Sequence, residues 1–96
     1  MKIIIGTAQF GMRYGLLNKS AVSQSEIKKI LQLSINKNIK TIDTAISYGS
    51  SELKLGEANV SKFKIISKLP SLINAGNNIQ DWVIKNIENS LKKLKI

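Results

Sequence analysis

Apolar residues in this chain recur with two different spacings, and the two kinds of segment alternate along the sequence. Three short runs rich in β-branched residues cover positions 2–5, 39–43 and 63–67, and such runs are typical of buried parallel strands. The segments that follow them place apolar residues three and four positions apart, which is typical of helices with one buried face. The order βαβαβα predicts an α/β fold with a parallel sheet and right-handed crossovers.

The first long helix has the clearest start signal. Ser23 and Glu26 have the spacing of a capping box, in which each side chain satisfies a backbone N–H group of the first turn. Val22 and Ile27 stand at the two positions of a hydrophobic staple. We expect this helix to end at residues 36–38, which include two asparagines.

A second, shorter helix is expected after the middle strand. Ser50 can cap its first turn, and Glu52 lies near the positive end of its dipole. We expect Leu53 and Leu55 to supply apolar contacts, and Gly56 either to allow a close approach or to begin the end of the helix.

The last helix follows a loop expected over residues 71–78. Asn78 or a neighbour is the expected cap, with Asp81 in the first turn. We expect this helix to bury an apolar stripe made of Ile84, Ile87, Leu91 and Leu94.

Residues 7–22 form a long connection that contains Gly11 and Gly15. Long loops after a strand are often functional, but a flexible cover over the strand end would have the same composition. Both readings remain open from the sequence.

Three chemically useful side chains are expected at the carboxyl ends of successive strands. Asp43 ends the second strand and Tyr48 follows it on the loop to the next helix, while Lys68 follows the third strand. Chemistry in parallel α/β folds is carried out at this edge of the sheet. Each residue alone could be a strand-end carboxylate, a loop aromatic or a surface lysine. Together they favour a functional site.

The composition of the chain excludes several kinds of site. The chain has 96 residues, fits one domain and contains neither cysteine nor histidine. Disulfides and thiolate metal sites are therefore excluded, and the commonest general base and metal ligand is missing. We expect no metal site and a reducing, cytoplasmic environment.

The formal net charge of +9 raises the question of a nucleic-acid partner. The cations are spread along the chain, however, and Arg13 is the sole arginine, so we expect a solvated basic surface and no nucleic-acid binding. The apolar run at the N-terminus is too short for a signal peptide or a membrane span. We therefore expect no membrane partner either.

Several short motifs, in order, resemble the aldo-keto reductase family, and the resemblance extends over essentially the whole chain. The motifs are Ile5-Gly6-Thr7-Ala8-Gln9-Phe10-Gly11, Ile42-Asp43-Thr44-Ala45, Tyr48-Gly49, Ser51-Glu52, Leu55-Gly56-Glu57 and Ile66-Ser67-Lys68. The resemblance implies a TIM (β/α)8 barrel, which needs about 250 residues. Residues 1–96 would be its first three β/α units, a single domain incomplete at the C-terminus.

The resemblance also implies a reaction, in which NADP(H) reduces a small aldehyde or ketone. It gives Tyr48 the role of proton donor to the carbonyl oxygen, and Lys68 that of the cation that makes the phenol a stronger acid. It makes Asp43 the partner of Lys68 and a contact of the cofactor's ribose, and places Gly6 and Thr7 beside the nicotinamide. An isolated phenol loses its proton only near pH 10, so a neighbouring ammonium is a sensible way to tune it.

Two parts of the family's machinery have no counterpart in these residues. The fourth catalytic residue is a histidine on the fourth strand, and the loops that hold the adenosine phosphate follow the last strands. We therefore expect the 96-residue chain alone to be inactive and to self-associate through its open sheet edges. The alternative is a non-catalytic binding or regulatory module that keeps the barrel pattern.

Overall fold

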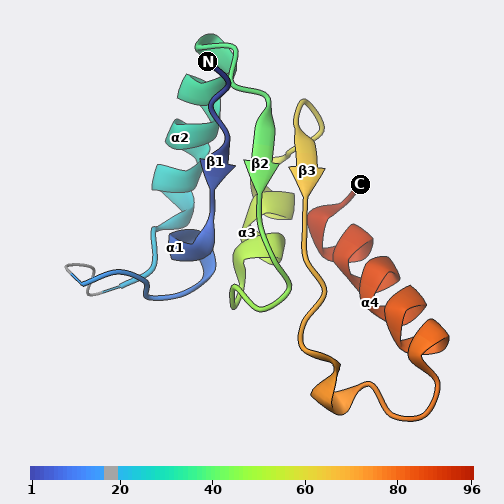
Figure 1. Ribbon diagram of the computed structural model, residues 1–96. Helices are drawn as coiled ribbons and strands as arrows, with labels where there is room; N and C mark the ends of the chain where they lie inside the picture. The colour runs from blue at the N-terminus through green and yellow to red at the C-terminus, as the bar shows by residue number, and fades with distance from the viewer. Residues whose placement is uncertain (17–19) are drawn as a thin grey trace.

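The computed structural model describes residues 1–16 and 20–96. Its three strands are β1 (Ile5–Gly6), β2 (Thr41–Asp43) and β3 (Lys64–Ile66), and they form one parallel sheet in the order β1-β2-β3. In the register of the sheet, Asp43 lies beside Gly6 on one side and Ile66 on the other. The three strands therefore end in step, at the same edge of the sheet (Figure 1). The predicted α/β order and parallel sheet are confirmed.

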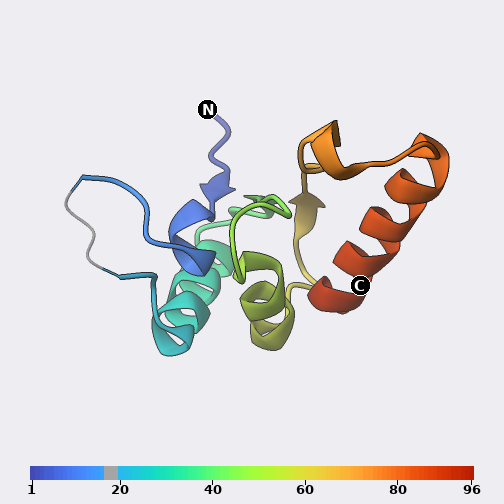
Figure 2. The ribbon, with the colours of Figure 1, turned by 90° about the horizontal axis from the view of Figure 1, so that it is seen from below.

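Helices connect the strands, and two of them cover one face of the sheet (Figure 2). The helices are α1 (Ala8–Gly11), α2 (Gln24–Asn36), α3 (Ser51–Ala58), the short 3-10 helix η1 (Leu72–Asn74) and α4 (Ile79–Leu94). Figure 2 shows α2 and α3 side by side below the strands, while no helix of the described residues lies over the opposite face of β1 and β2. None of the described helices is long and apolar enough to cross a membrane.

Two expectations about connections need correction. The segment 7–22 is not all loop, because α1 forms directly after β1; its residues 17–19 lie outside the described residues. The segment 71–78 likewise contains η1, and the N–H of Ile73 in this short helix donates to the Ser71 hydroxyl at 3.4 Å.

The strands are shorter than predicted. Residues 2–4 are exposed and lie outside the sheet. In the register of the sheet, Ile5 lies opposite Ile42, and β2 extends only one residue before Ile42, to Thr41. Lys2 and Ile3 would therefore lie beyond the start of β2, and no strand residue is opposite them.

The predicted cap of α4 is confirmed, whereas only one of the two hydrogen bonds of the predicted capping box in α2 forms. The Ser23 hydroxyl accepts the N–H of Glu26 at 3.3 Å, but the Glu26 carboxylate pairs with Lys29 at 3.3 Å and does not close the capping box. In α4, the Asn78 side-chain oxygen accepts the N–H of Asp81 at 3.0 Å.

The start of α3 differs from the prediction. Ser50 occupies the cap position, but its side chain makes no capping bond and instead donates to the Gly11 carbonyl at 3.5 Å. Leu55 is fully buried as expected, whereas Leu53 is exposed.

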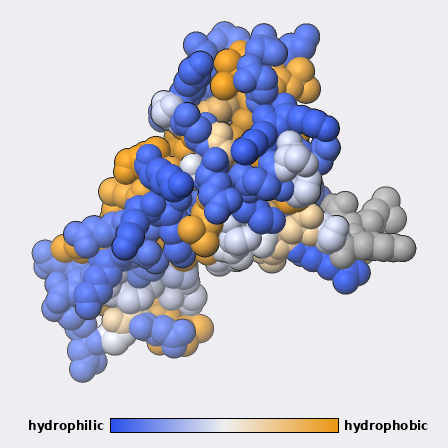
Figure 3. All heavy atoms as spheres, turned by 180° about the vertical axis from the view of Figure 1, so that it is seen from behind, coloured by the Kyte–Doolittle hydropathy of each residue, from blue (hydrophilic) through white to orange (hydrophobic). Residues whose placement is uncertain are grey.

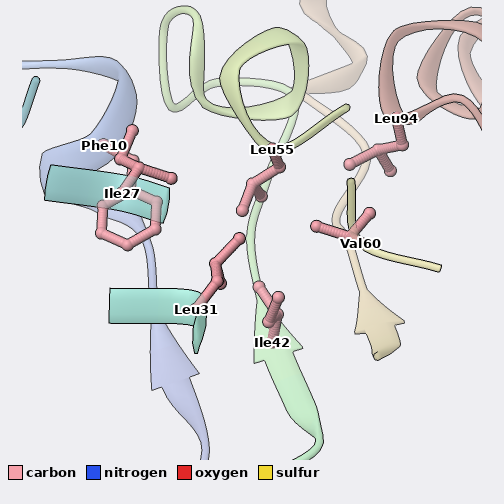
Figure 4. Close-up of a cluster of buried hydrophobic side chains, with 7 residues drawn as sticks. All are labelled: Phe10, Ile27, Leu31, Ile42, Leu55, Val60 and Leu94. Atoms are coloured by element: carbon pink, nitrogen blue, oxygen red, sulfur yellow. The ribbon is translucent and has the colours of Figure 1, made fainter. Parts of the chain in front are cut away.

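The core lies between the sheet and α2 and α3. Figure 4 shows its seven buried side chains, Phe10, Ile27, Leu31, Ile42, Leu55, Val60 and Leu94. They come from α1, α2, β2, α3, the α3–β3 connection and the end of α4.

The prediction of a buried stripe on α4 is wrong for three of its four residues. Ile84, Ile87 and Leu91 are 44–48% exposed, and only Leu94 is buried. The last turn of α4 approaches α3 so closely that a Cβ on Gly56 would overlap the Lys93 carbonyl oxygen. The rest of α4 leans away from β3, and apolar surface is exposed on that side of the molecule (Figures 1 and 3).

Candidate active site

The three side chains predicted to form a site do come together at the ends of the strands. Asp43 is the last residue of β2, Tyr48 lies in the connection from β2 to α3, and Lys68 follows β3 by two residues. The Lys68 ammonium pairs with the Asp43 carboxylate, donates to the Thr44 carbonyl at 2.8 Å, and lies 5.2 Å from the centre of the Tyr48 ring. We call Asp43, Tyr48 and Lys68 the strand-end cluster.

Lys68 is held in its charged form. The hydrogen bond that Lys68 donates to the Asp43 carboxylate is the largest effect, and it raises the pKa of Lys68 above its ordinary value of 10.5. Burial is the next largest effect and opposes this, while the negative charge of Asp43 and the Tyr48 side chain raise the pKa further. The side chains of Lys68 and Asp43 are 47% and 36% exposed. The ion pair is thus open to a small molecule, and it contributes little to stability because solvent screens it.

The loop that carries Tyr48, residues 44–50, is pressed against α1. A Cβ on Gly11 would overlap the carbonyl oxygen of Tyr48, and Gly49 adopts a left-handed φ of +58° where a Cβ would overlap the Gly11 carbonyl. The N–H of Ser50 donates to the Gly11 carbonyl at 3.2 Å. Glycine is therefore required at both positions for this close approach. We call residues 44–50 the Tyr48 loop.

The other side of the Tyr48 loop is bonded to the segment after β3. The N–H of Thr44 donates to Ile66 at 2.8 Å, and the N–H of Ile46 donates to the backbone carbonyl of Lys68 at 3.2 Å. The parallel pairing of β2 and β3 thus continues beyond the strands themselves, which brings Lys68 to the same level as the Tyr48 loop.

Three buried hydroxyls lie beneath the strand-end cluster. Thr7, Thr44 and Ser51 are fully buried. Ser51 Oγ is 3.0 Å from both Thr7 Oγ1 and Thr44 Oγ1, and the Thr7 hydroxyl donates to the Asp43 carbonyl at 3.0 Å. We call these three residues the hydroxyl network. The sequence reasoning gave no role to Thr44 or Ser51, because small polar residues near strand ends do not indicate which partners they meet.

Gly6 and Thr7, the predicted neighbours of a cofactor, lie in a pocket beside Tyr48. We call it the neutral pocket; it is lined by Gly6, Thr7, Ala8, Gln9, Tyr14 and Tyr48. None of these side chains is charged. A Cβ on Gly6 would meet nothing within 4 Å, so the backbone here faces open space. Thr7 itself is fully buried: its side chain is part of the hydroxyl network, and its N–H donates to the Asp43 carbonyl.

One further carboxylate, that of Glu52, is buried in the first turn of α3, where the sequence predicted it. Glu52 is only 3% exposed, and neither of its carboxylate oxygens has a hydrogen-bond partner among the described residues. Across the same residues, no three acidic side chains gather closely enough to hold a metal ion.

The arrangement is similar to that of solved proteins. Two structures described as aldo-keto reductases of Pseudomonas aeruginosa match 96% of this chain at 28% and 27% identity, both with a TM-score of 0.74. A third, described as a 2,5-diketo-D-gluconic acid reductase B, is 22% identical with a TM-score of 0.59, and shows the fold alone. The chain spans 38%, 36% and 29% of the lengths of these three proteins.

No curated protein matches the chain significantly. The model of the aldo/keto reductase family, however, matches residues 2–96. The three parallel strands with alternating helices correspond to the N-terminal part of the TIM barrel of that family, as predicted. This chain belongs to the aldo/keto reductase family.

Proposed function

We propose that this chain supplies the proton-donating part of an NAD(P)H-dependent carbonyl reductase, with Tyr48 as the donor. The observation that carries the proposal is the position of Lys68, whose ammonium meets the Asp43 carboxylate, the Thr44 carbonyl and the face of Tyr48 at one strand end. A side chain that served only as a surface cation would have no need of these three partners.

The proposed division of labour follows from charge. A phenol that gives its proton to a carbonyl oxygen becomes an anion, and a nearby ammonium stabilises that anion by Coulomb attraction. Asp43 keeps Lys68 protonated and fixes its position. The carbonyl substrate would accept a hydrogen bond from the Tyr48 hydroxyl, and the cofactor, when bound, supplies the hydride that the carbonyl carbon receives.

The neutral pocket fits one end of a dinucleotide cofactor. An uncharged, flat ring such as a nicotinamide can rest against the open backbone at Gly6, and the pocket's lining has no cation to hold a phosphate. We therefore assign Gly6 to the nicotinamide end, with the buried Thr7 next to it in the chain, and Asp43 to the adjoining ribose. A choice between NADPH and NADH depends on groups that would hold the adenosine half.

The chain has no histidine, so a second hydrogen-bond donor to the substrate carbonyl would have to be another group. We propose that the 96-residue chain alone is therefore inactive or nearly so. A cytoplasmic location, a small-molecule carbonyl substrate and the absence of nucleic-acid and membrane partners also remain proposals.

The test is the substitution Tyr48→Phe in the intact natural gene product, whatever its length. We expect carbonyl reduction to fall at least 100-fold, since a positioned general acid contributes about 10²–10⁴ in rate, while cofactor binding measured by fluorescence stays within a factor of two or so. Tyr14→Phe is the matched control, because Tyr14 lines the same pocket.

Equal turnover in the Tyr48→Phe variant and its parent would contradict the proposed role of Tyr48. A parent protein that binds cofactor but reduces none of a broad set of aldehydes and ketones would favour the alternative, a non-catalytic binding module of the same family.

A further inference from the structure

The contacts of the hydroxyl network fix the order in which its three hydroxyls donate to one another. The Asp43 carbonyl oxygen can only accept, so the Thr7 hydroxyl must donate to it. Ser51 must then donate to Thr7, either to Oγ1 at 3.0 Å or to the carbonyl at 3.2 Å. Thr44 must in turn donate to Ser51, at 3.0 Å. The three hydroxyls form a directed chain with Ser51 in the middle.

This directed chain joins three separate parts of the fold. Thr7 follows β1, Thr44 follows β2, and Ser51 opens α3. The contacts link residues 36 and 44 positions apart in the sequence. Because all three side chains are fully buried, water cannot replace a missing partner, and a lost bond leaves a buried polar group unsatisfied.

Both acceptors of the Lys68 ammonium belong to residues that the network holds. Lys68 pairs with the Asp43 side chain and donates to the Thr44 carbonyl. The Asp43 backbone is fixed by the Thr7 hydroxyl and by the Thr7 N–H, which donates to the same carbonyl at 3.1 Å. Thr44 is fixed by its own hydroxyl on Ser51.

The network also closes the Tyr48 loop at its base. The loop runs from Thr44 to Ser50. The hydrogen bond between Thr44 and Ser51 joins the first residue of the loop to the first residue of α3, which follows the loop directly. The Ser51 N–H donates to the carbonyl of Tyr48 at 3.1 Å. These two contacts therefore hold the base of the loop that carries Tyr48.

We propose that Thr7, Thr44 and Ser51 are positioning residues, which set the distance between Tyr48 and Lys68 from beneath without touching substrate or cofactor through their side chains. Ser51 has the largest share because it makes contacts with both threonines. That these residues support catalysis rests on the proposed function. That they hold the partners of Lys68 in place does not. It can be tested without any turnover.

The readout is the titration of the Lys68 ammonium, followed by NMR of its side-chain carbon and nitrogen signals, which are assigned by their loss in Lys68→Met. In the parent chain we expect a pKa of Lys68 above 10.5. In Ser51→Ala and in Thr44→Val the partners of Lys68 lose their anchor, so its pKa should fall towards 10.5.

Two matched variants separate positioning from ordinary stability. Thr44→Ser restores the hydroxyl and should return the Lys68 titration to that of the parent. Ser34→Ala removes another buried serine hydroxyl, one that donates to the Ile30 carbonyl at 2.6 Å within α2, and should leave the titration unchanged even if it lowers stability.

An unchanged Lys68 titration in folded Thr44→Val would overturn the proposal, and so would an equal shift in Ser34→Ala. If Ser51→Ala does not fold, Thr44→Val decides alone, since valine keeps the shape of threonine. A parent chain that shows the expected titration pattern but no carbonyl reduction in the intact gene product would refute the proposed function and leave the positioning role standing.

Discussion

The two sides of α3 differ in how completely the chain covers them. On the side of α1 and α2, the Tyr48 loop touches backbone at Gly11, and the core residues Leu55 and Ile42 are fully buried. On the side of α4, Leu94 is the one buried residue of that helix, and a groove between β3 and α4 stays open; it is lined by Ile46, Ile65, Ser67, Lys68, Leu69, Ile87, Ser90, Leu91, Leu94 and Ile96. We call it the α4 groove.

The difference shows which part of the molecule holds the site. Tyr48 and Asp43 depend on the well-covered side, through close backbone contacts and buried hydrogen bonds. Of the three residues in the strand-end cluster, Lys68 is the one that also lines the α4 groove, so it contacts both sides of the molecule. The site is therefore built mainly by β1, β2 and α3, and the α4 side adds one cation.

The largest expected effect contrasts two leucines, one on each side. Leu55→Ala removes a fully buried side chain from the core and should lower the free energy of unfolding by about 3 kcal/mol. Leu91→Ala truncates a residue of α4 that is 44% exposed, and should lower the free energy of unfolding by less than about 1 kcal/mol. Urea unfolding measures both, and equal losses would show that the two sides are packed alike.

The next effect tests the close approach beneath Tyr48. Gly11→Ala places a Cβ on the Tyr48 carbonyl and should cost about 2 kcal/mol by overpacking. Gly6→Ala is the matched control, because a Cβ there meets nothing within 4 Å. Thermal unfolding with the same midpoint for both variants would contradict the contact between α1 and the Tyr48 loop.

Self-association should follow from the open side. Exposed apolar residues on α4 favour contacts between copies at high concentration. We expect light scattering to show concentration-dependent oligomers of the chain, and the double variant Ile87→Lys with Leu91→Lys to reduce them. A parent chain that stays monomeric over the whole range would be evidence against this proposal.

The smallest effect concerns the ion pair of the site. Because the pKa of Lys68 is raised on folding, the stability contributed by the pair is present below the ordinary value of 10.5 and is lost as pH rises through the higher folded value. Asp43→Asn should therefore destabilise by less than about 1 kcal/mol near neutral pH. The difference from the parent should vanish in strongly alkaline solution, and a difference that grows there would contradict the assignment.

The sequence predicted the parts of this fold that depend on local signals. The cap of α4 at Asn78 and the strand-end positions of Asp43 and Lys68 follow from neighbouring residues, and they are found as expected. The buried stripe of α4 was a local inference too, but burial requires a neighbour. The periodicity of Ile84 and Leu91 cannot show whether the described chain supplies one.

The titratable side chains of the candidate site could be predicted from the sequence, but the buried hydroxyl network that holds them in place could not. Asp43, Tyr48 and Lys68 stand out by chemistry and by the family resemblance. Ser51 does not, because its partners are distant in sequence and its hydroxyl acts only through three-dimensional contacts. Buried networks of this kind become visible only when the strands are placed in register.

The most direct test of the central claim follows the hydride itself. The intact natural gene product would be given NADPH carrying deuterium at the transferable position, together with a set of simple aldehydes and ketones, and the alcohol products would be analysed by mass spectrometry. The account predicts an alcohol one mass unit heavier, formed by the parent protein and not by Tyr48→Phe. Alcohol formed equally by both proteins, or no labelled alcohol from the parent, would contradict it.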